Sequence, residues 1–215
     1  MMTFSSDLVS EIIRCQDISE GEIFEVLFSP EFNRYFPMLI EELGLDENLT
    51  TVDEIDFYSW RDQLDDVKGS VAFERGLRDY IENKASDEED HVLGLISDGQ
   101  IELFREIRLK TGPESLRDTL SRELGECWTP DRNKAHSYFG EGIPHAYVFH
   151  ALAPEDSIDW ENTLIRRCTL SIGEDEDEVT LIKGSKVELL GITHEHEGTR
   201  TEIDFADWLP SRVTI

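Results

Sequence analysis

The sequence has few cysteines, few basic residues and no long apolar run. Its 215 residues include Cys15, Cys127 and Cys168, an odd number without a C-x-x-C pair. This argues against a disulfide framework or a zinc site and fits a reducing compartment. No apolar stretch reaches the ~20 residues of a membrane span, and the N-terminus lacks the basic start and apolar run of a signal peptide. We therefore expect a soluble, cytoplasmic protein with no membrane partner.

Basic residues are the most pronounced deficit. Twenty lysines and arginines face 48 aspartates and glutamates, which gives a formal net charge of −28. Such a surface repels nucleic acid phosphates and anionic membranes and attracts a basic partner. Two interpretations stay open: a salt-adapted or highly soluble protein, and a mimic of nucleic acid that binds a basic protein.

The acidic excess is uneven along the chain. Residues 1–100 carry 25 acidic and 7 basic side chains, and residues 135–215 carry 16 and 6. Residues 105–134 carry 6 acidic and 7 basic side chains, so this segment has no acidic excess. A site for an anionic ligand requires a segment of this kind.

The first half of the chain has helical periodicity. Ser5 or Ser6 can cap a first helix, and a second begins at Pro30 and ends at Gly44. A further helical stretch covers residues 52–83, with a break near Gly69. Hydrophobic residues make up 39% of the chain, enough for a folded core.

The second half has the alternation and turn residues of strands. An acidic linker, Asp87-Glu-Glu-Asp90, separates the halves, with a boundary between residues 85 and 98. This gives a helical region over 1–95 and a second domain over 96–215. Its expected elements are strands at 101–109, 146–153 and 168–172, helices ending at Gly125 and starting after Thr129, and a hairpin of 178–182 with 186–192.

Three segments of the second half occur in a fixed order. They are Leu103-Phe-Arg-Glu-Ile-Arg108, Cys127-Trp-Thr-Pro-Asp-Arg-Asn-Lys-Ala-His-Ser-Tyr-Phe139, and Glu174-Asp-Glu-Asp-Glu-Val-Thr-Leu-Ile182. Together they resemble the arginine, Ser/Thr-x-Ser/Thr and Glu-x-Glu motifs of ADP-ribosyltransferases of the diphtheria- and cholera-toxin-like superfamily. The likeness is strongest to small phage and bacterial members and covers residues 100–193.

The resemblance implies an α+β fold and a reaction. The fold is a split antiparallel β-sandwich, two small facing sheets with a cleft between them, beside the helical N-terminal region. The reaction uses NAD as substrate, needs no metal, and moves ADP-ribose to an acceptor with release of nicotinamide. The acceptor stays open between a protein side chain, a nucleic acid base and a small molecule.

Arg105 is the candidate for the first role, binding of the NAD pyrophosphate. A guanidinium binds phosphate oxygens bidentately in a way that an ammonium cannot. Arg108 lies three residues further on and therefore points to the opposite face of the strand. The alternative for Arg105 is a surface ion pair with one of the many carboxylates.

The second segment provides small polar side chains beside the nicotinamide ribose. Thr129 fits this role, and Cys127 occupies the position of the family's first hydroxyl residue. Trp128, Tyr138 and Phe139 are candidates to stack on the nicotinamide. The alternatives are a helix cap for Thr129 and core packing for at least two of the three aromatic residues.

The third segment carries the charge that the reaction needs. Breaking the nicotinamide–ribose bond places positive charge on the ribose, and a fixed carboxylate stabilises it. Glu178 is the candidate because it directly precedes an apolar strand. The resemblance then implies that Glu176 engages the acceptor. The pair Glu174 and Glu176 is an alternative register, and a solvated acidic loop is the alternative without function.

Other polar residues are weaker candidates. Glu106 stands where the family has glycine, and would oppose NAD binding unless strand alternation turns it away from Arg105. His194 and His196 share one strand face, but no third ligand follows at a convincing spacing, so a surface strand end is favoured over a metal site. His145 and His150 belong to a buried strand and are interpreted as structural.

Two functional hypotheses follow. The first is an NAD-dependent ADP-ribosyltransferase, with Arg105, Glu176 and Glu178 as catalytic residues and a macromolecular acceptor. The second is a catalytically inactive domain of the same fold that acts as an acidic inhibitor or nucleic-acid mimic on a basic protein.

Overall fold

The computed structural model describes residues 6–16, 18–46, 48–52, 63–112, 116, 124–135, 142–169, 177–204 and 212–215. The chain is an α+β protein that divides into two compact units. The helical unit comprises Met1–Glu89 and Leu164–Gly173, and the sheet unit comprises Asp90–Thr163 and Glu174–Ile215. The helical unit is therefore built from two separate segments of the chain.

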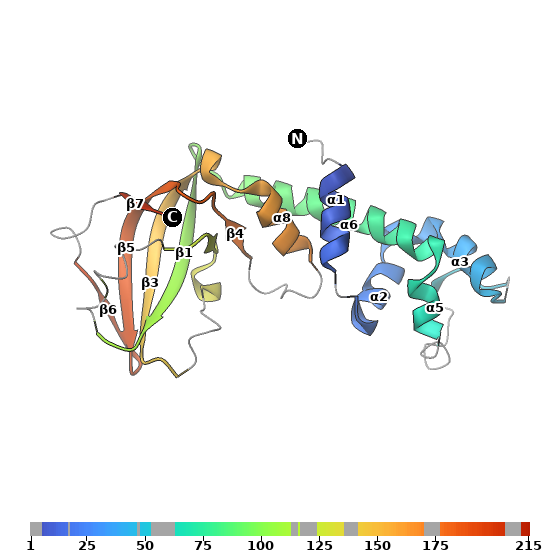
Figure 1. Cartoon of the computed structure of the whole chain (residues 1–215), viewed down its shortest axis with the longest axis horizontal. Helices are drawn as coiled ribbons and strands as arrows, with labels where there is room; N and C mark the ends of the chain where they lie inside the picture. The colour runs from blue at the N-terminus through green and yellow to red at the C-terminus, as the bar shows by residue number, and fades with distance from the viewer. Residues whose placement is uncertain are drawn as a thin grey trace. The chain divides into compact units, whose positions relative to one another are not determined.

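In the described residues before the sheet unit, the helical unit contains short helices and one long one (Figure 1). They are α1 (Ser6–Cys15), α2 (Glu20–Leu27), the 3-10 helix η1 (Pro30–Arg34), α3 (Phe36–Leu43), α5 (Leu64–Lys68) and α6 (Val71–Gly94). The single helix expected from Pro30 to Gly44 is thus two elements, because Pro37 begins a new helix at its first turn. Gly44 ends α3 in the left-handed conformation, as its sequence position predicts.

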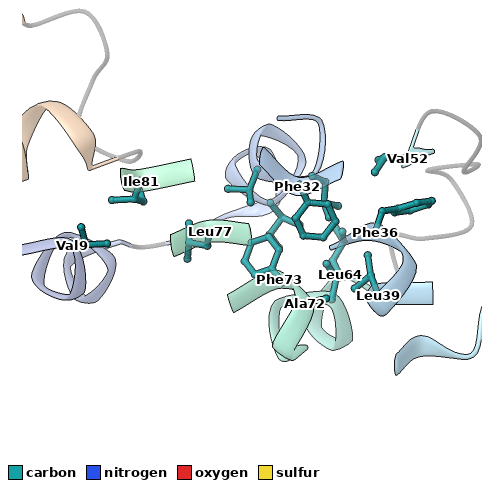
Figure 2. Close-up of a cluster of buried hydrophobic side chains, with 14 of the residues drawn as sticks. Val9, Phe32, Phe36, Leu39, Val52, Leu64, Ala72, Phe73, Leu77 and Ile81 are labelled. Atoms are coloured by element: carbon teal, nitrogen blue, oxygen red, sulfur yellow. The ribbon is translucent and has the colours of Figure 1, made fainter. Parts of the chain in front are cut away.

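Aromatic rings from three of these helices form the core of the unit. Phe32, Phe36 and Phe73 are fully buried, and the rings of Phe32 and Phe73 lie 6.5 Å apart (Figure 2). Leu39 and Leu77 extend the same cluster. The spacing of these apolar residues along the sequence is what makes each helix amphipathic.

Gly76 on α6 provides a test of this core. A Cβ built there would lie 2.2 Å from Phe32 Cδ2. Alanine normally stabilises a helix by about 1 kcal/mol relative to glycine, but overpacking a core costs about 1–3 kcal/mol. We expect Gly76→Ala to lower the free energy of unfolding measured in urea, whereas Gly94→Ala, with no atom near its Cβ, leaves it unchanged or raises it. Equal stability of the two variants would contradict this packing.

The expected acidic linker is helical. Residues 87–90 lie within α6, and the boundary between the two units falls inside this helix. Glu89 is buried, and Glu88 accepts a hydrogen bond of 2.7 Å from Arg167 Nε. A run of charges in the sequence predicts a solvated segment, because the sequence does not show which carboxylates have partners from distant segments.

Cys168 does not begin a strand, contrary to the prediction from the sequence. It is the last residue of α8 (Trp160–Cys168), and residues 170–176 lie outside the described part. Burial raises the pKa of the Cys168 thiol to about 12, so this thiol stays protonated and unreactive at neutral pH. Only Thr169 of the expected strand is otherwise described.

The sheet unit contains a five-stranded antiparallel sheet and a two-stranded one (Figure 1). The larger sheet consists of β1 (Gln100–Leu109), β3 (His145–Pro154), β5 (Lys186–His196), β6 (Thr199–Glu202) and β7 (Arg212–Thr214). The smaller sheet pairs β2 (Cys127–Trp128) with β4 (Val179–Thr180), and the unit also has 3-10 helices η5 (Arg132–Lys134) and η7 (Glu155–Ser157). In the larger sheet β3 lies between β1 and β5. On the other edge of β5, residues 193–196 pair with β6 and residues 186–188 pair with β7.

Among the described residues, one β-bridge joins the two sheets. Thr129, directly after β2, forms a bridge with Phe104 on the free edge of β1 through hydrogen bonds of 2.7 and 3.0 Å. The chain order across this point is therefore β4, β2, β1, β3, β5, β6. The bridge places the second and third sequence segments beside the first.

The expected hairpin of 178–182 with 186–192 is wrong. β4 pairs with β2, whereas β5 pairs with β3, β6 and β7. The turn between them contains Gly184 at φ +88°, and its N–H donates to the Ile215 carbonyl at 2.8 Å. The sequence of a short turn between two apolar runs is the same whether the turn closes a hairpin or connects two sheets. Strands distant in the sequence decide which pairing forms.

Candidate functional site

Arg105 lies on the face of β1 that is directed into the core. The residues before it on that face, Ile101 and Leu103, are fully buried. Its Nη1 donates a hydrogen bond to the carbonyl oxygen of Cys127. Gly125 adopts φ +86°, and a Cβ there would lie 2.7 Å from Nη2 of Arg105. A glycine at this position therefore lets the guanidinium approach the chain before β2 closely.

Two opposing effects act on the charge of Arg105. Burial is the larger and lowers the pKa of its guanidinium, while the nearby Cys127 and Glu178 raise it. An arginine pKa is high enough for the group to stay positive at neutral pH despite this burial. Its buried Nε has no hydrogen-bond partner among the described residues, so the fixed cation retains donor capacity.

Glu178 reaches the same place from the third segment. It directly precedes β4, in which Val179 is paired with Trp128. In the same antiparallel register, Glu178 therefore lies opposite Thr129. Glu178 is half-buried, and its Oε1 is shielded from solvent. Its carboxylate is close enough to Arg105 to raise the pKa of that residue.

The residue before Glu178 is anchored by charge. Asp177 adopts the left-handed conformation at φ +48°, which is uncommon for a residue with a side chain. Its carboxylate accepts a hydrogen bond of 3.1 Å from Lys134 Nζ, and His91 Nε2 lies 4.0 Å from its other oxygen. These contacts tie the chain leading into Glu178 to η5, which follows the second segment.

Thr129 is bound into the sheet rather than capping a long helix. Its hydroxyl oxygen accepts a hydrogen bond of 3.2 Å from the Asp131 amide, and the side chain is 5% exposed. Asp131 caps η5, with its carboxylate accepting from the Asn133 amide at 2.8 Å. The expected helix starting after Thr129 is therefore wrong in its first turn, because Asp131 provides a competing cap.

Trp128 belongs to the core. It is 2% exposed, and its Nε1 donates to the Gly125 carbonyl at 3.0 Å, so the indole offers no free face to a ligand. Cys127 is opposite Thr180 in the β2–β4 register. Tyr138, Phe139, Glu174 and Glu176 lie outside the described residues.

The objection raised by Glu106 is removed by strand alternation. Glu106 Oε1 accepts a hydrogen bond of 2.6 Å from Arg108 Nε, and both side chains lie on the face of β1 opposite Arg105. The opposite orientation of Arg105 and Arg108 was expected from their spacing. Glu106 therefore does not compete for the Arg105 guanidinium.

A histidine cluster was missed by the sequence analysis. His145, interpreted as structural, joins His194 and His196, and its Nδ1 lies 2.9 Å from His194 Nε2. The signal was the position of His145 at the start of β3, but its strand partner could not be read from the sequence. Among the described residues no group of three histidine, cysteine or acidic side chains has an arrangement that could hold a metal ion.

The chain matches no protein family model, no curated protein and no solved structure closely enough to indicate a relative. Among the described residues, no helix has both the length and the apolar character needed to cross a bilayer. The site combines a half-buried guanidinium and a half-buried carboxylate at the point where β1, β2 and β4 meet.

Proposed function

We propose that this protein is an NAD-dependent ADP-ribosyltransferase with the core of a split antiparallel β-sandwich. The observation that supports it best is the convergence of three distant segments. Arg105 donates to the Cys127 carbonyl, Thr129 bridges Phe104, and β4 brings Glu178 beside them. A cation for the pyrophosphate and an anion for the ribose are thus held in one place, as the reaction requires.

The proposed reaction breaks one bond and forms another at the ribose C1′. The bond between the ribose C1′ and the nicotinamide nitrogen breaks, and its electron pair leaves with nicotinamide. The acceptor nucleophile forms the new bond at C1′ and loses its proton. Arg105 binds the pyrophosphate, Thr129 and Cys127 flank the ribose, and Glu178 stabilises the positive charge of the transition state. Glu176 orients the acceptor.

The acceptor class follows from electrostatics. A chain of net charge −28 repels nucleic acids and favours encounter with a basic protein. We therefore propose a basic protein as acceptor. Labelling of a nucleic acid or a small molecule instead is an alternative outcome of the test.

The test is incubation of the full chain with NAD labelled in the adenylate and, separately, in the nicotinamide. We expect nicotinamide release together with label on a basic protein such as a histone, and little label on an acidic protein or on RNA. Salt screens the attraction between surface charges, so transfer to the histone should decrease as the salt concentration rises from about 0.05 to about 0.5 M. Over this range the Debye length falls below about 10 Å. Free ADP-ribose as the only product would indicate hydrolysis.

A second function is favoured by two other observations and by a different interpretation of the Arg105 hydrogen bond. Arg105 already donates to a backbone carbonyl, Trp128 is buried, and Cys127 replaces a hydroxyl residue. These fit an inactive domain of the same fold that uses its negative charge to bind and block a basic protein. Tight, salt-sensitive binding of a histone without any nicotinamide release would support this function over the first.

A further inference from the structure

Five threonines are buried among the described residues, and the hydroxyl of one of them differs from the others. Four hydroxyls are hydrogen-bonded within the protein, those of Thr129, Thr163, Thr169 and Thr193. The exception is Thr180 in β4, which is 3% exposed. Its hydroxyl oxygen is shielded from solvent and has no hydrogen-bond partner among the described residues.

A buried hydroxyl without a partner is costly to the folded state. Burial removes its hydrogen bonds to water, and no group in the described part of the protein replaces them. Valine has the same branched shape and the same preference for strands, but it has no polar atom to satisfy. Packing alone therefore favours valine at position 180, and the threonine indicates a hydrogen-bond partner from outside the chain.

The backbone of Thr180 determines where its side chain lies. Its N–H donates to Thr163 Oγ1 at 3.0 Å, and its carbonyl accepts from the Asp159 N–H at 2.9 Å. Because both backbone groups are used outside the β2–β4 pairing, Cys127 and Thr180 form a non-hydrogen-bonded pair in the register of these strands. In such a pair the Cα atoms are only about 4.5 Å apart, and the two side chains are neighbours.

Thr180 shares its face of the smaller sheet with residues of the candidate site. Glu178 is two residues earlier in the chain and therefore points to the same side. Cys127 lies opposite Thr180, and Thr129 lies opposite Glu178 in the same register. Cys127 and Glu178 are only partly buried. A ligand group that enters between these two side chains therefore reaches the Thr180 hydroxyl.

The other side chains of this face leave the role of hydrogen-bond donor open. A thiol such as that of Cys127 is a weak donor, and an ionised carboxylate such as that of Glu178 only accepts. The Thr129 hydroxyl is used within the chain, since it donates to the Asp131 carbonyl at 3.5 Å and accepts from the Asp131 amide at 3.2 Å. Among the described residues of this face, Thr180 thus carries the strong donor that is still available.

We propose that Thr180 is a ligand-binding residue, whose hydroxyl donates a hydrogen bond to a ribose hydroxyl of a nucleotide that lies between Cys127 and Glu178. The identity of the nucleotide as NAD, and of the ribose as the one that carries nicotinamide, rests on the proposed function. The requirement for a partner from outside the chain rests on the buried hydroxyl and is independent of the reaction.

The probe for this contact is ADP-ribose, which carries the same ribose but has no nicotinamide to release. In calorimetric titrations of the full chain, we expect Thr180→Val to weaken ADP-ribose binding by about 2- to 10-fold, the effect of one hydrogen bond between neutral groups. Thr180→Ser retains the hydroxyl and should bind as tightly as the parent. Equal affinity of Thr180→Val and the parent, or no binding of ADP-ribose by the parent, would overturn the proposal.

The stability of the ligand-free chain should change in the opposite direction. Because valine removes an unpaired polar atom and retains the shape, we expect Thr180→Val to raise the melting temperature by about 2–4 °C. The matched control is Thr193→Val, which should lower it, because the Thr193 hydroxyl donates to Glu202 at 3.0 Å and accepts from Arg132 at 2.9 Å. A lower melting temperature for both variants, or a Thr180→Val chain that does not fold, would show that the Thr180 hydroxyl is structural and refute the proposal.

This contact and the proposed function fail separately. Weaker ADP-ribose binding by a more stable Thr180→Val variant, with no nicotinamide release from NAD by the parent, would support the contact and contradict the transferase. Nicotinamide release by the parent, with ADP-ribose affinity unchanged by Thr180→Val, would support the transferase and contradict the contact.

Discussion

Replacing Glu178 with glutamine is expected to lower the rate of ADP-ribose transfer by at least ~100-fold, or about 2.7 kcal/mol in the transition state. Glutamine retains the size of the side chain and a carbonyl that can accept a hydrogen bond from the ribose. It removes the negative charge that opposes the positive charge developing on C1′. The effect should therefore appear in kcat, with little change in the KM for NAD.

The control for this variant is Glu188→Gln. Glu188 is a glutamate of β5 on the outer face of the larger sheet, remote in register from Arg105. It removes one negative charge from the chain without touching the site. Nicotinamide release from labelled NAD is the measurement, and equal kcat for Glu178→Gln and the parent would refute the role of this carboxylate.

Replacing Arg105 with lysine is expected to raise the KM for NAD by about 10- to 100-fold, the value of a charge-assisted hydrogen bond of about 1.5–3 kcal/mol. Lysine retains the charge but lacks the planar pair of donors that fits a pyrophosphate. Its three N–H groups also share one nitrogen, so it cannot place one nitrogen at the Cys127 carbonyl and another at the ligand, as arginine can. The loss should therefore be seen in ADP-ribose affinity as well as in the KM for NAD.

Arg108→Lys is the matched control, because Arg108 is on the same strand and points to the opposite face. Urea unfolding of both variants separates lost binding from lost stability, since the Arg105 guanidinium also donates a hydrogen bond to the Cys127 carbonyl at the start of β2. If Arg105→Lys binds ADP-ribose as tightly as Arg108→Lys does, the guanidinium is structural and the pyrophosphate is bound elsewhere.

The sequence was sufficient where structure depends on neighbouring residues. The alternation of residues 101–109 predicts β1 and places Arg105 and Arg108 on opposite faces, as observed. The apolar run at 146–153 predicts β3, and Gly44 predicts the end of α3. In each case the signal is a side-chain period or a backbone conformation, which a few consecutive residues determine.

The candidate site was only partly predictable. Its three segments could be named from their order, but Trp128 was a candidate for ligand stacking and lies in the core. Nothing in the spacing of His145, His194 and His196 shows that their rings would stack. Burial and contact at these positions depend on strands that are far apart along the chain.

By itself, the sequence determined the excess of negative charge, the periodicity of single elements and the face to which each strand residue points. Tertiary structure alone decided that residues 179–180 pair with β2 instead of forming a hairpin, and that the acidic run at 87–90 is helical. The physical reason is that strand pairing and burial are chosen among segments distant in sequence, whose competing energies no local pattern contains.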